Sequence, residues 1–188
     1  GLFTTTRLVY ANPNEDLNRY FYDTVFDLVN NKAQTLGDIY VGTKNKFALL
    51  NGDPNYRKFA LLGDPAIKLA MAEKNVLIDS INKDTVNALS EVIIHGHVAD
   101  HLQNKLTNFN GRVYITFFDK KSTYNTLGTN SGSTASTFQM WKNIIYKGKS
   151  SVNNGDFSFT FKVPKDISYN YGLSRISFYA ENNLVDAS

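Results

Sequence analysis

RKFALLGDPAIKLA, residues 57–70, separates two halves of the chain that follow different sequence patterns. Its apolar run 59–62 is typical of a buried strand. Residues 66–70 predict a short extended segment that leads out of the following turn. The aspartate of Gly63-Asp64-Pro65 could take part in acid–base chemistry. We interpret the tripeptide instead as a turn, because Asp bonds readily to its own backbone and proline fixes φ. This stretch therefore closes the first half of the chain.

The half before this stretch alternates strand and helix. GLFTTTRLVY, residues 1–10, predicts a strand that runs into a loop. Asn12 as N-cap, Pro13 at the first helical position and Glu15 closing a capping box predict a helix that continues to about residue 30. Thr35, with an acidic residue three positions later, predicts the start of a second helix.

One strand, two helices and one strand make an incomplete α/β layer. Helices of such layers normally pack on several parallel strands, so we expect the missing strands upstream of Gly1 or from a partner. The chain begins with Gly rather than Met, which favours a processed or recombinant segment from which localisation signals are missing. Residues 1–10 show neither the basic start nor the long apolar centre of a signal peptide.

From about residue 75 the pattern changes to short strands divided by turn residues. Phe157, Phe159 and Phe161 alternate with Ser158 and Thr160, which predicts a strand with one buried face. The predicted strands are NVLIDSI (75–81), EVIIHGHVA (91–99), RVYITFFD (112–119), FQMWKNIIYKG (138–148), DFSFTFKVP (156–164) and RISFYAEN (175–182).

These patterns define the predicted fold class and domains. Residues 1–72 are an α/β fragment, and residues 75–188 form an all-β sandwich of immunoglobulin type, with six or seven antiparallel strands. The boundary lies within 71–74. The Ser/Thr/Gly/Asn-rich stretch 126–137 predicts a flexible loop rather than a second boundary.

Composition excludes several classes of function. The 20 basic and 17 acidic side chains give a net charge of +3, spread too thinly for the basic stripe of a nucleic-acid-binding protein. No cysteine is present, so the chain has no disulfide, thiolate metal site or thiol nucleophile of its own. No apolar run reaches the length of a transmembrane helix, so we predict no transmembrane segment.

Two sets of residues are candidates for chemistry. His95 and His97 lie two apart on a predicted strand, so they face one side and could share a metal with His101 or Asp100. We prefer an ordinary surface strand and assign no metal and no cofactor. Arg7 follows the first strand, where open α/β sheets bind ligands; it could line a pocket or make a structural salt bridge.

Several segments in this order resemble a known family. TTTRLVYANPN (4–14) followed by FALLGDPAIKLA (59–70) is similar to the end of the gingipain-type cysteine peptidase domain. FNGRVYITFFDKK (109–121), IYKGKSSVNNGDFSFTFKVPKDI (145–167) and RISFYAEN (175–182) resemble the immunoglobulin-like domain that follows it in the type IX secretion sortases of that family.

The resemblance implies a caspase-like α/β domain whose catalytic His and Cys precede the matched segment, so no catalytic residue is assigned here and the chain alone is expected to be inactive. In gingipains the loop after this strand helps form the wall of the substrate pocket, which implies substrate-binding roles for Arg7, Leu8 and Tyr10. Gingipains tend to have Trp where this chain has Tyr10, so substrate preference is not carried over.

The parent protein would be a cysteine endopeptidase or transpeptidase that processes the C-terminal sorting domains of exported proteins. Its partners would be those substrates and other type IX secretion components, at the outer membrane, cell surface or periplasm. Two alternatives stay open. One is a secreted gingipain-like protease; the other is a surface adhesion or glycan-binding module in which Tyr114, Trp141 and Tyr146 form an aromatic platform.

Overall fold

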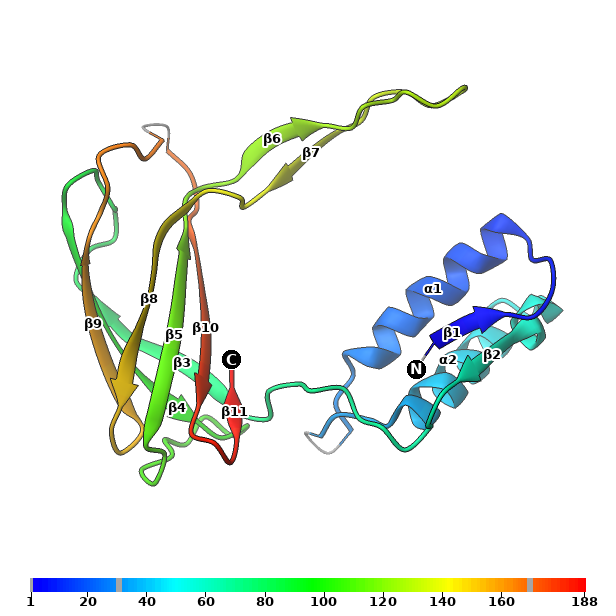
Figure 1. The fold of residues 1–188 in the computed structure, drawn as a ribbon, viewed down its shortest axis with the longest axis horizontal. Helices are drawn as coiled ribbons and strands as arrows, with labels where there is room; N and C mark the ends of the chain where they lie inside the picture. Colours follow the sequence, from blue (N-terminus) through cyan, green and yellow to red (C-terminus); the bar gives the residue numbers. More distant parts are fainter. Residues whose placement is uncertain (1, 30–31, 169–170) are drawn as a thin grey trace. The chain divides into compact units, whose positions relative to one another are not determined.

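The computed structural model describes residues 2–29, 32–168 and 171–188 (Figure 1). It divides the chain into two compact units, Gly1–Met71 and Ala72–Ser188. The chain is mixed α/β, with two α-helices in the first unit and mostly antiparallel sheets. Among the described residues, the helices lack the combined length and hydrophobicity of a membrane span.

The first unit has a short sheet and two helices. Its elements are β1 (Leu2–Thr5), α1 (Ala11–Val25), α2 (Leu36–Leu50), the 3-10 helix η1 (Pro54–Lys58) and β2 (Phe59–Leu62). β1 and β2 pair antiparallel, with Phe3 opposite Leu61 and Thr5 opposite Phe59. The strands and helices expected from the sequence are therefore present, but the two strands form an antiparallel pair.

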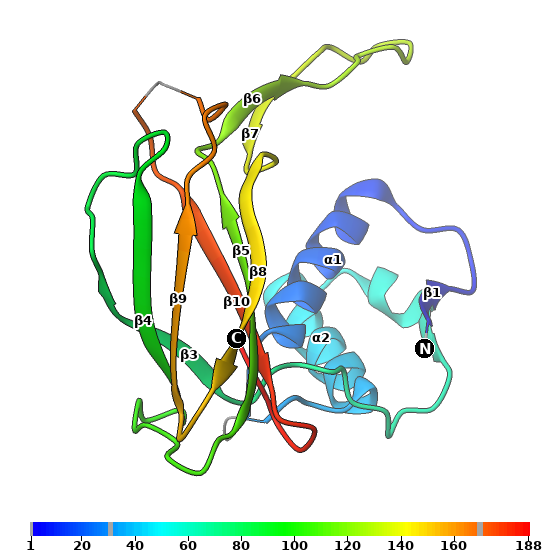
Figure 2. The ribbon, with the colours of Figure 1, turned by 60° about the vertical axis from the view of Figure 1, so that its left-hand side comes forward.

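One face of this sheet packs on the helices, which both lie on the same side of β1 (Figure 2). The ring of Phe3 lies 5.4 Å from that of Phe21 in α1 and 5.5 Å from that of Tyr40 in α2. Leu17 and Phe47 are fully buried between the elements. Burial of these side chains is the main stabilising contribution to the unit.

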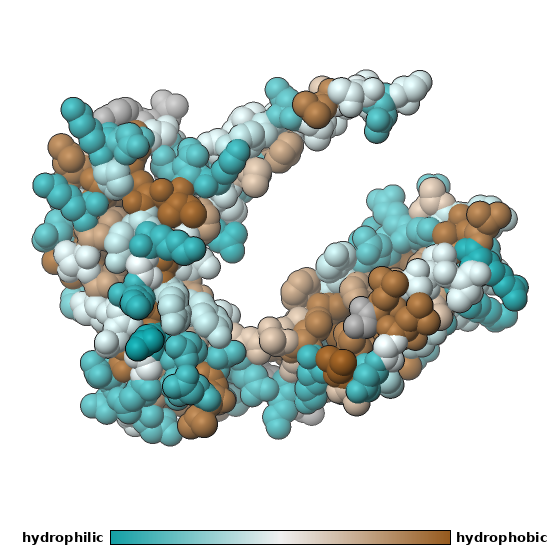
Figure 3. Space-filling model, viewed as in Figure 1, coloured by the Kyte–Doolittle hydropathy of each residue, from teal (hydrophilic) through white to brown (hydrophobic). Residues whose placement is uncertain are grey.

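The opposite face of the sheet is largely apolar and partly exposed. Successive residues of a strand point to opposite faces, so Leu2 and its cross-strand partner Leu62 point away from the helices. They are 58% and 56% exposed, and hydrophobic residues gather in this region of the first unit (Figure 3). The prediction that 59–62 is a buried strand was therefore wrong for this outer face, because helices cover only one side.

The predicted start of α1 was also wrong. The N-cap is Tyr10, whose side chain makes no capping hydrogen bond, and the expected capping box of Asn12 and Glu15 is not formed. Pro13 is tolerated in the first turn because the first four helical N–H groups have no intrahelical partner in any case. The helix ends at Val25, and residue 30, where we placed its end, lies outside the described residues.

The second helix begins as predicted. The Thr35 hydroxyl accepts a hydrogen bond from the Asp38 backbone N–H, and the Asp38 carboxylate accepts from the Thr35 N–H. These two bonds form the reciprocal capping box.

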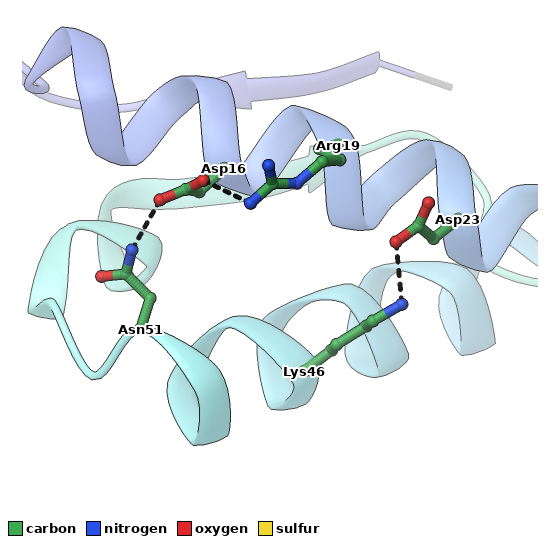
Figure 4. A network of polar contacts seen from close by, with 5 residues as sticks. All are labelled: Asp16, Arg19, Asp23, Lys46 and Asn51. Carbon is green, nitrogen blue, oxygen red and sulfur yellow. Dashed lines mark hydrogen bonds and ion pairs between the residues drawn. The ribbon is translucent and has the colours of Figure 1, made fainter.

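Polar side chains also join the two helices at the surface (Figure 4). Asp16 pairs with Arg19 at 2.7 Å and accepts a hydrogen bond from the Asn51 amide at 2.8 Å. Lys46 of α2 pairs with Asp23 of α1 at 2.9 Å. Exposed pairs of this kind each stabilise by at most about 1 kcal/mol, so they orient the helices more than they hold them.

The second unit consists of two antiparallel sheets around one core, and a separate hairpin. One sheet has the order β11 (Asp186–Ala187), β10 (Arg175–Glu181), β5 (Gly111–Phe118), β8 (Ile144–Val152). The other has the order β3 (Asn75–Ile81), β4 (Glu91–Ala99), β9 (Asp156–Lys162). Both contribute to one cluster of buried residues, which includes Ile94, Ile115 and Phe159. We refer to it as the two-sheet unit.

The alternation predicted for residues 157–161 is confirmed. Phe157, Phe159 and Phe161 are buried in the shared core, while Ser158 and Thr160 are exposed. The register is fixed in part by Gly96 of β4, which lies opposite Phe157. A Cβ atom at Gly96 would lie 2.5 Å from the Phe157 ring and 2.4 Å from the Leu77 carbonyl oxygen, so only glycine fits there.

One predicted strand proved to be two. Residues 138–148 contain the end of β7 (Thr137–Met140) and the start of β8, and the chain changes partner between them. β7 pairs with β6 (Ser122–Asn125) in a two-stranded hairpin, whereas β8 pairs with β5. The predicted loop 126–137 connects β6 and β7, with Thr137 already in the strand.

Candidate functional site

The candidate substrate-facing loop is the segment 6–10 between β1 and α1. At its start, the backbone N–H and the hydroxyl of Thr6 both donate to the Lys58 carbonyl oxygen, at 2.8 and 3.0 Å. At its end, the Tyr10 N–H donates to the side-chain oxygen of Asn55 at 3.4 Å. The loop is therefore fastened at both ends to η1.

Asn55 is the buried polar residue that positions this loop. It is 1% exposed. Its amide nitrogen donates to the Asn14 side chain at 2.9 Å, and its backbone N–H donates to Asp53 at 2.7 Å. One side chain thus ties loop, α1 and η1 together. The sequence NGDPN (51–55) indicated only a turn, because the partners of Asn55 are 41 and 45 residues away.

The loop presents all three predicted site residues to solvent. Arg7 is exposed, Leu8 is 93% exposed and Tyr10 is 68% exposed. The Lys58 ammonium lies 4.8 Å from the centre of the Tyr10 ring, which restrains that ring. Among the ion pairs of the described residues, none involves Arg7. A cation, an apolar side chain and a phenol on one anchored loop can contact an extended peptide.

The Gly63-Asp64-Pro65 segment is a turn, as predicted. The Asp64 carboxylate accepts a hydrogen bond from the Ala66 N–H at 2.8 Å. The Pro65 carbonyl accepts from the N–H of Gly37 at the start of α2, at 2.9 Å. A Cβ at Gly37 would lie 3.0 Å from Pro65, so this turn packs tightly on the helix. Asp64 therefore has a structural role in this unit.

The histidines lie on the outer side of the two-sheet unit. His95 and His97 are both in β4, and the His97 ring nitrogen Nδ1 lies 2.7 Å from the Asp79 carboxylate. In the ranges that the structure describes, no group of three His, Cys, Asp or Glu side chains could hold a metal ion.

Asp100, the other candidate ligand, is occupied by its own turn. Its carboxylate accepts hydrogen bonds from the backbone N–H groups of Leu102 and Asn104, at 2.8 and 2.9 Å. The hydrogen bond from the Asn104 backbone N–H is the main reason why the pKa of Asp100 lies below its usual value, because this bond favours the charged carboxylate.

The proposed aromatic platform is not formed. The Tyr146 ring stacks on Phe161 in the core with centres 4.5 Å apart, whereas Tyr114 lies on the opposite face of the same sheet beside Tyr179. Tyr114 and Tyr146 are three register positions apart on neighbouring strands, and an odd number reverses the face. This finding overturns the three-residue platform.

A cavity of about 560 Å³ opens at one end of the two-sheet unit. Phe117, Ile145 and Ile176 are among its apolar lining, and Asp119 and Lys120 are among its polar lining. The buried Asp119 carboxylate accepts from the Ser168 N–H at 3.0 Å and lies 3.5 Å from the Lys120 ammonium. The Lys120 ammonium donates to the Ser168 carbonyl oxygen, so both charges fasten the segment that follows β9.

Comparisons with known proteins agree with the resemblance noted in the sequence. Residues 1–70 match the family described as peptidase family C25. The whole chain is similar to PorU from Porphyromonas gingivalis, solved as a dimeric latent form, with 27% identity and a TM-score of 0.57. That similarity covers 99% of this chain and 18% of the PorU chain, so the chain spans less than a fifth of the length of PorU.

A second solved structure, the sporulation control protein Spo0M from Bacillus subtilis, matches with 15% identity over 62% of this chain and 46% of its own. Because its TM-score is only 0.32, we infer neither fold nor function from this match. No curated protein matches the chain. The family match over residues 1–70 and the PorU match over the whole chain show that this chain is related to the gingipain-type cysteine peptidases and to PorU.

Proposed function

We propose that the chain is the end of the peptidase domain of a type IX secretion sortase-like cysteine peptidase, together with the immunoglobulin-like domain that follows. Residues 1–72 would complete the caspase-like domain, and residues 75–188 would be the immunoglobulin-like domain that braces it. The observation that carries the proposal is the similarity to PorU over 99% of the chain at 27% identity.

The open sheet of the first unit supports the proposal. Most residues on both faces of β1 and β2 are apolar, with one threonine on each face, and Leu2 and Leu62 are exposed on the face away from the helices. Strands that are apolar on both faces are typical of a sheet covered on both sides, as in α/β domains. We infer that other strands and helices of the parent enzyme cover this face.

The immunoglobulin-like assignment rests on the second unit. It has sheets of four and three antiparallel strands around one core, as do sandwiches of constant immunoglobulin type. In this proposal the parent acts outside the cytoplasm, at the outer membrane or cell surface, on the C-terminal sorting domains of exported proteins.

In the parent, a cysteine thiolate would attack a peptide carbonyl while a histidine moves the proton, giving an acyl-enzyme. The chain has no cysteine, so the thiolate would belong to another part of the parent. The chain would contribute the anchored loop 6–10 as one wall of the substrate pocket, with Arg7, Leu8 and Tyr10 facing the substrate.

A peptidyl thiol-reactive probe tests this function in the parent protein. We expect stoichiometric labelling of one cysteine of the parent that lies outside residues 1–188, and cleavage of a peptide that carries a sorting-domain junction. Arg7→Ala together with Leu8→Ala should raise KM by about tenfold or more, because two substrate contacts are lost. Arg57→Ala, an exposed arginine of η1 outside the loop, is the matched control and should leave KM unchanged.

The products distinguish the related hypotheses. Transfer of the acyl group to an added amine indicates a sortase, and hydrolysis alone indicates a gingipain-like protease. A parent protein that neither reacts with the probe nor cleaves peptide contradicts the proposal. An unchanged KM in the double variant contradicts the role given to the loop.

A further inference from the structure

The β6–β7 hairpin forms an arm that projects beyond the two sheets. We define the arm as residues 122–140, comprising β6, β7 and the connection between them. It continues the chain from the end of β5 to the start of β8, and both views show it leading away from the sheets (Figures 1 and 2). Tyr124 pairs with Phe138, and Ser122 pairs with Met140.

The arm is amphipathic. Because paired residues share a face and alternate along the strand, Tyr124, Phe138 and Met140 lie on one face together with Ser122. The other face carries only polar residues: Thr123, Asn125, Thr137 and Gln139. Phe138 and Met140 are 44% and 41% exposed. A two-stranded hairpin is marginally stable in water by itself, so an apolar face left in solvent indicates a surface that covers it.

The charge of this region identifies the kind of surface. Residues 120–155 contain five lysines, at positions 120, 121, 142, 147 and 149, and no acidic residue. The remaining residues of the second unit, 72–119 and 156–188, contain seven basic and ten acidic side chains. The arm and its base are therefore a local cationic region in a unit that is otherwise acidic.

Cations and aromatic rings are in contact at the base of the arm. The ammonium of Lys142 lies 5.3 Å from the centre of the Tyr124 ring. The Trp141 ring has the Lys121 ammonium at 4.2 Å and the Arg175 guanidinium at 5.3 Å from its centre. The Trp141 indole N–H donates to the Leu173 carbonyl at 3.3 Å, which holds the ring in place.

We propose that the arm docks on the surface of an anionic lipid bilayer. Tyr124, Phe138 and Met140 would enter the interfacial layer, where aromatic and apolar side chains are favoured, and Lys121, Lys142 and Arg175 would meet the lipid phosphates. A second copy of the arm would bring like charges together, which disfavours pairing of two such faces. A projecting arm with one apolar face and a cationic base matches a broad anionic surface.

Vesicle co-sedimentation of the full chain tests the proposal. We expect binding to phosphatidylcholine vesicles that contain about 30% phosphatidylglycerol, and little binding to pure phosphatidylcholine. Binding should fall steeply in about 0.5 M NaCl, because salt screens the lipid charge. Equal sedimentation with both vesicle types, or no sedimentation with either, overturns the proposal. In the second case, the apolar face of the arm would instead be a candidate contact surface for a protein partner.

Matched variants locate the binding surface. Each cation near an anionic surface contributes roughly a fivefold factor, so Lys121→Gln, Lys142→Gln and Arg175→Gln together should weaken binding about a hundredfold. Lys83→Gln with Lys162→Gln removes exposed charges outside the arm and should have little effect.

Phe138→Ser with Met140→Ser should also release the protein from the vesicles, whereas Thr123→Ser with Gln139→Ser, on the polar face, should not. If the arm and control variants bind equally, the arm is not the docking site.

Discussion

Phe161→Ala is expected to lower the free energy of unfolding of the two-sheet unit by about 3–5 kcal/mol, the range for buried aromatic truncations. Phe161 is 5% exposed. Its ring centre lies 4.5 Å from that of Tyr146 and 5.3 Å from that of Phe117, so it joins β9 to both β8 and β5. Truncation of the Phe161 side chain leaves a cavity between the two sheets, and the surrounding strands cannot move far enough to close it.

The single tryptophan of the chain makes this effect measurable in one unit. Trp141 follows β7 in the two-sheet unit, so its fluorescence during urea denaturation reports that unit rather than the helical one. Thr160→Ala, an exposed neighbour on the same strand, is the control and should change the stability by less than about 0.5 kcal/mol. Equal denaturation midpoints for Phe161→Ala and the original chain would show that the shared core is wrongly described.

Leu62→Asp is expected to change the stability of the isolated chain little and to destabilise the parent enzyme strongly. In the chain, Leu62 is 56% exposed and points away from the helices, so a charge there should cost less than about 0.5 kcal/mol. In the parent, the proposal buries this position beneath the rest of the peptidase domain. An unpaired buried carboxylate then costs several kcal/mol, and peptidase activity should be lost.

Thermal unfolding of both proteins and the peptidase rate of the parent check this prediction. Leu62→Met keeps the apolar character and approximate volume of the side chain and should leave both proteins nearly unchanged. If Leu62→Asp leaves the parent as stable and active as the original enzyme, the outer face of β1 and β2 is not covered there.

Most of the elements could be predicted because their signals are local. Thr35 and Asp38 are three residues apart, so the capping box of α2 was visible in the sequence and is confirmed. The alternation of Phe157, Phe159 and Phe161 with polar residues likewise required only the period of a strand. β11 has two residues, too few for a period to be recognised.

The errors arose where distant contacts decide the structure. Asn12 is a good N-cap residue, yet the helix begins at Ala11, after an N-cap residue whose N–H is bonded to Asn55. The strand break after Met140 follows from pairing partners that local propensity does not specify. The inward position of Tyr146 depends on the register of β8 against β5, which a single sequence does not show.

The candidate site was recoverable only in part. The position of Arg7 after a strand pointed to the loop, and the family resemblance pointed to Leu8 and Tyr10. Neither indicated Asn55 and Lys58, which hold the loop through contacts more than 40 residues away in the sequence. A site residue can thus be identified from its motif, whereas the residues that position it depend on tertiary structure.

Hydrogen exchange of the backbone amides of β1 and β2 shows whether neighbouring strands complete this sheet in the parent protein. In the isolated chain these strands pair only with each other among the described residues, so the amides that point away from the pair have no strand partner there. If the chain completes a larger peptidase domain, the amides on at least one outer edge should exchange about a hundredfold or more slowly in the parent. Equally fast exchange in both proteins would show that no neighbouring strand joins this sheet and that the chain does not complete a larger peptidase domain.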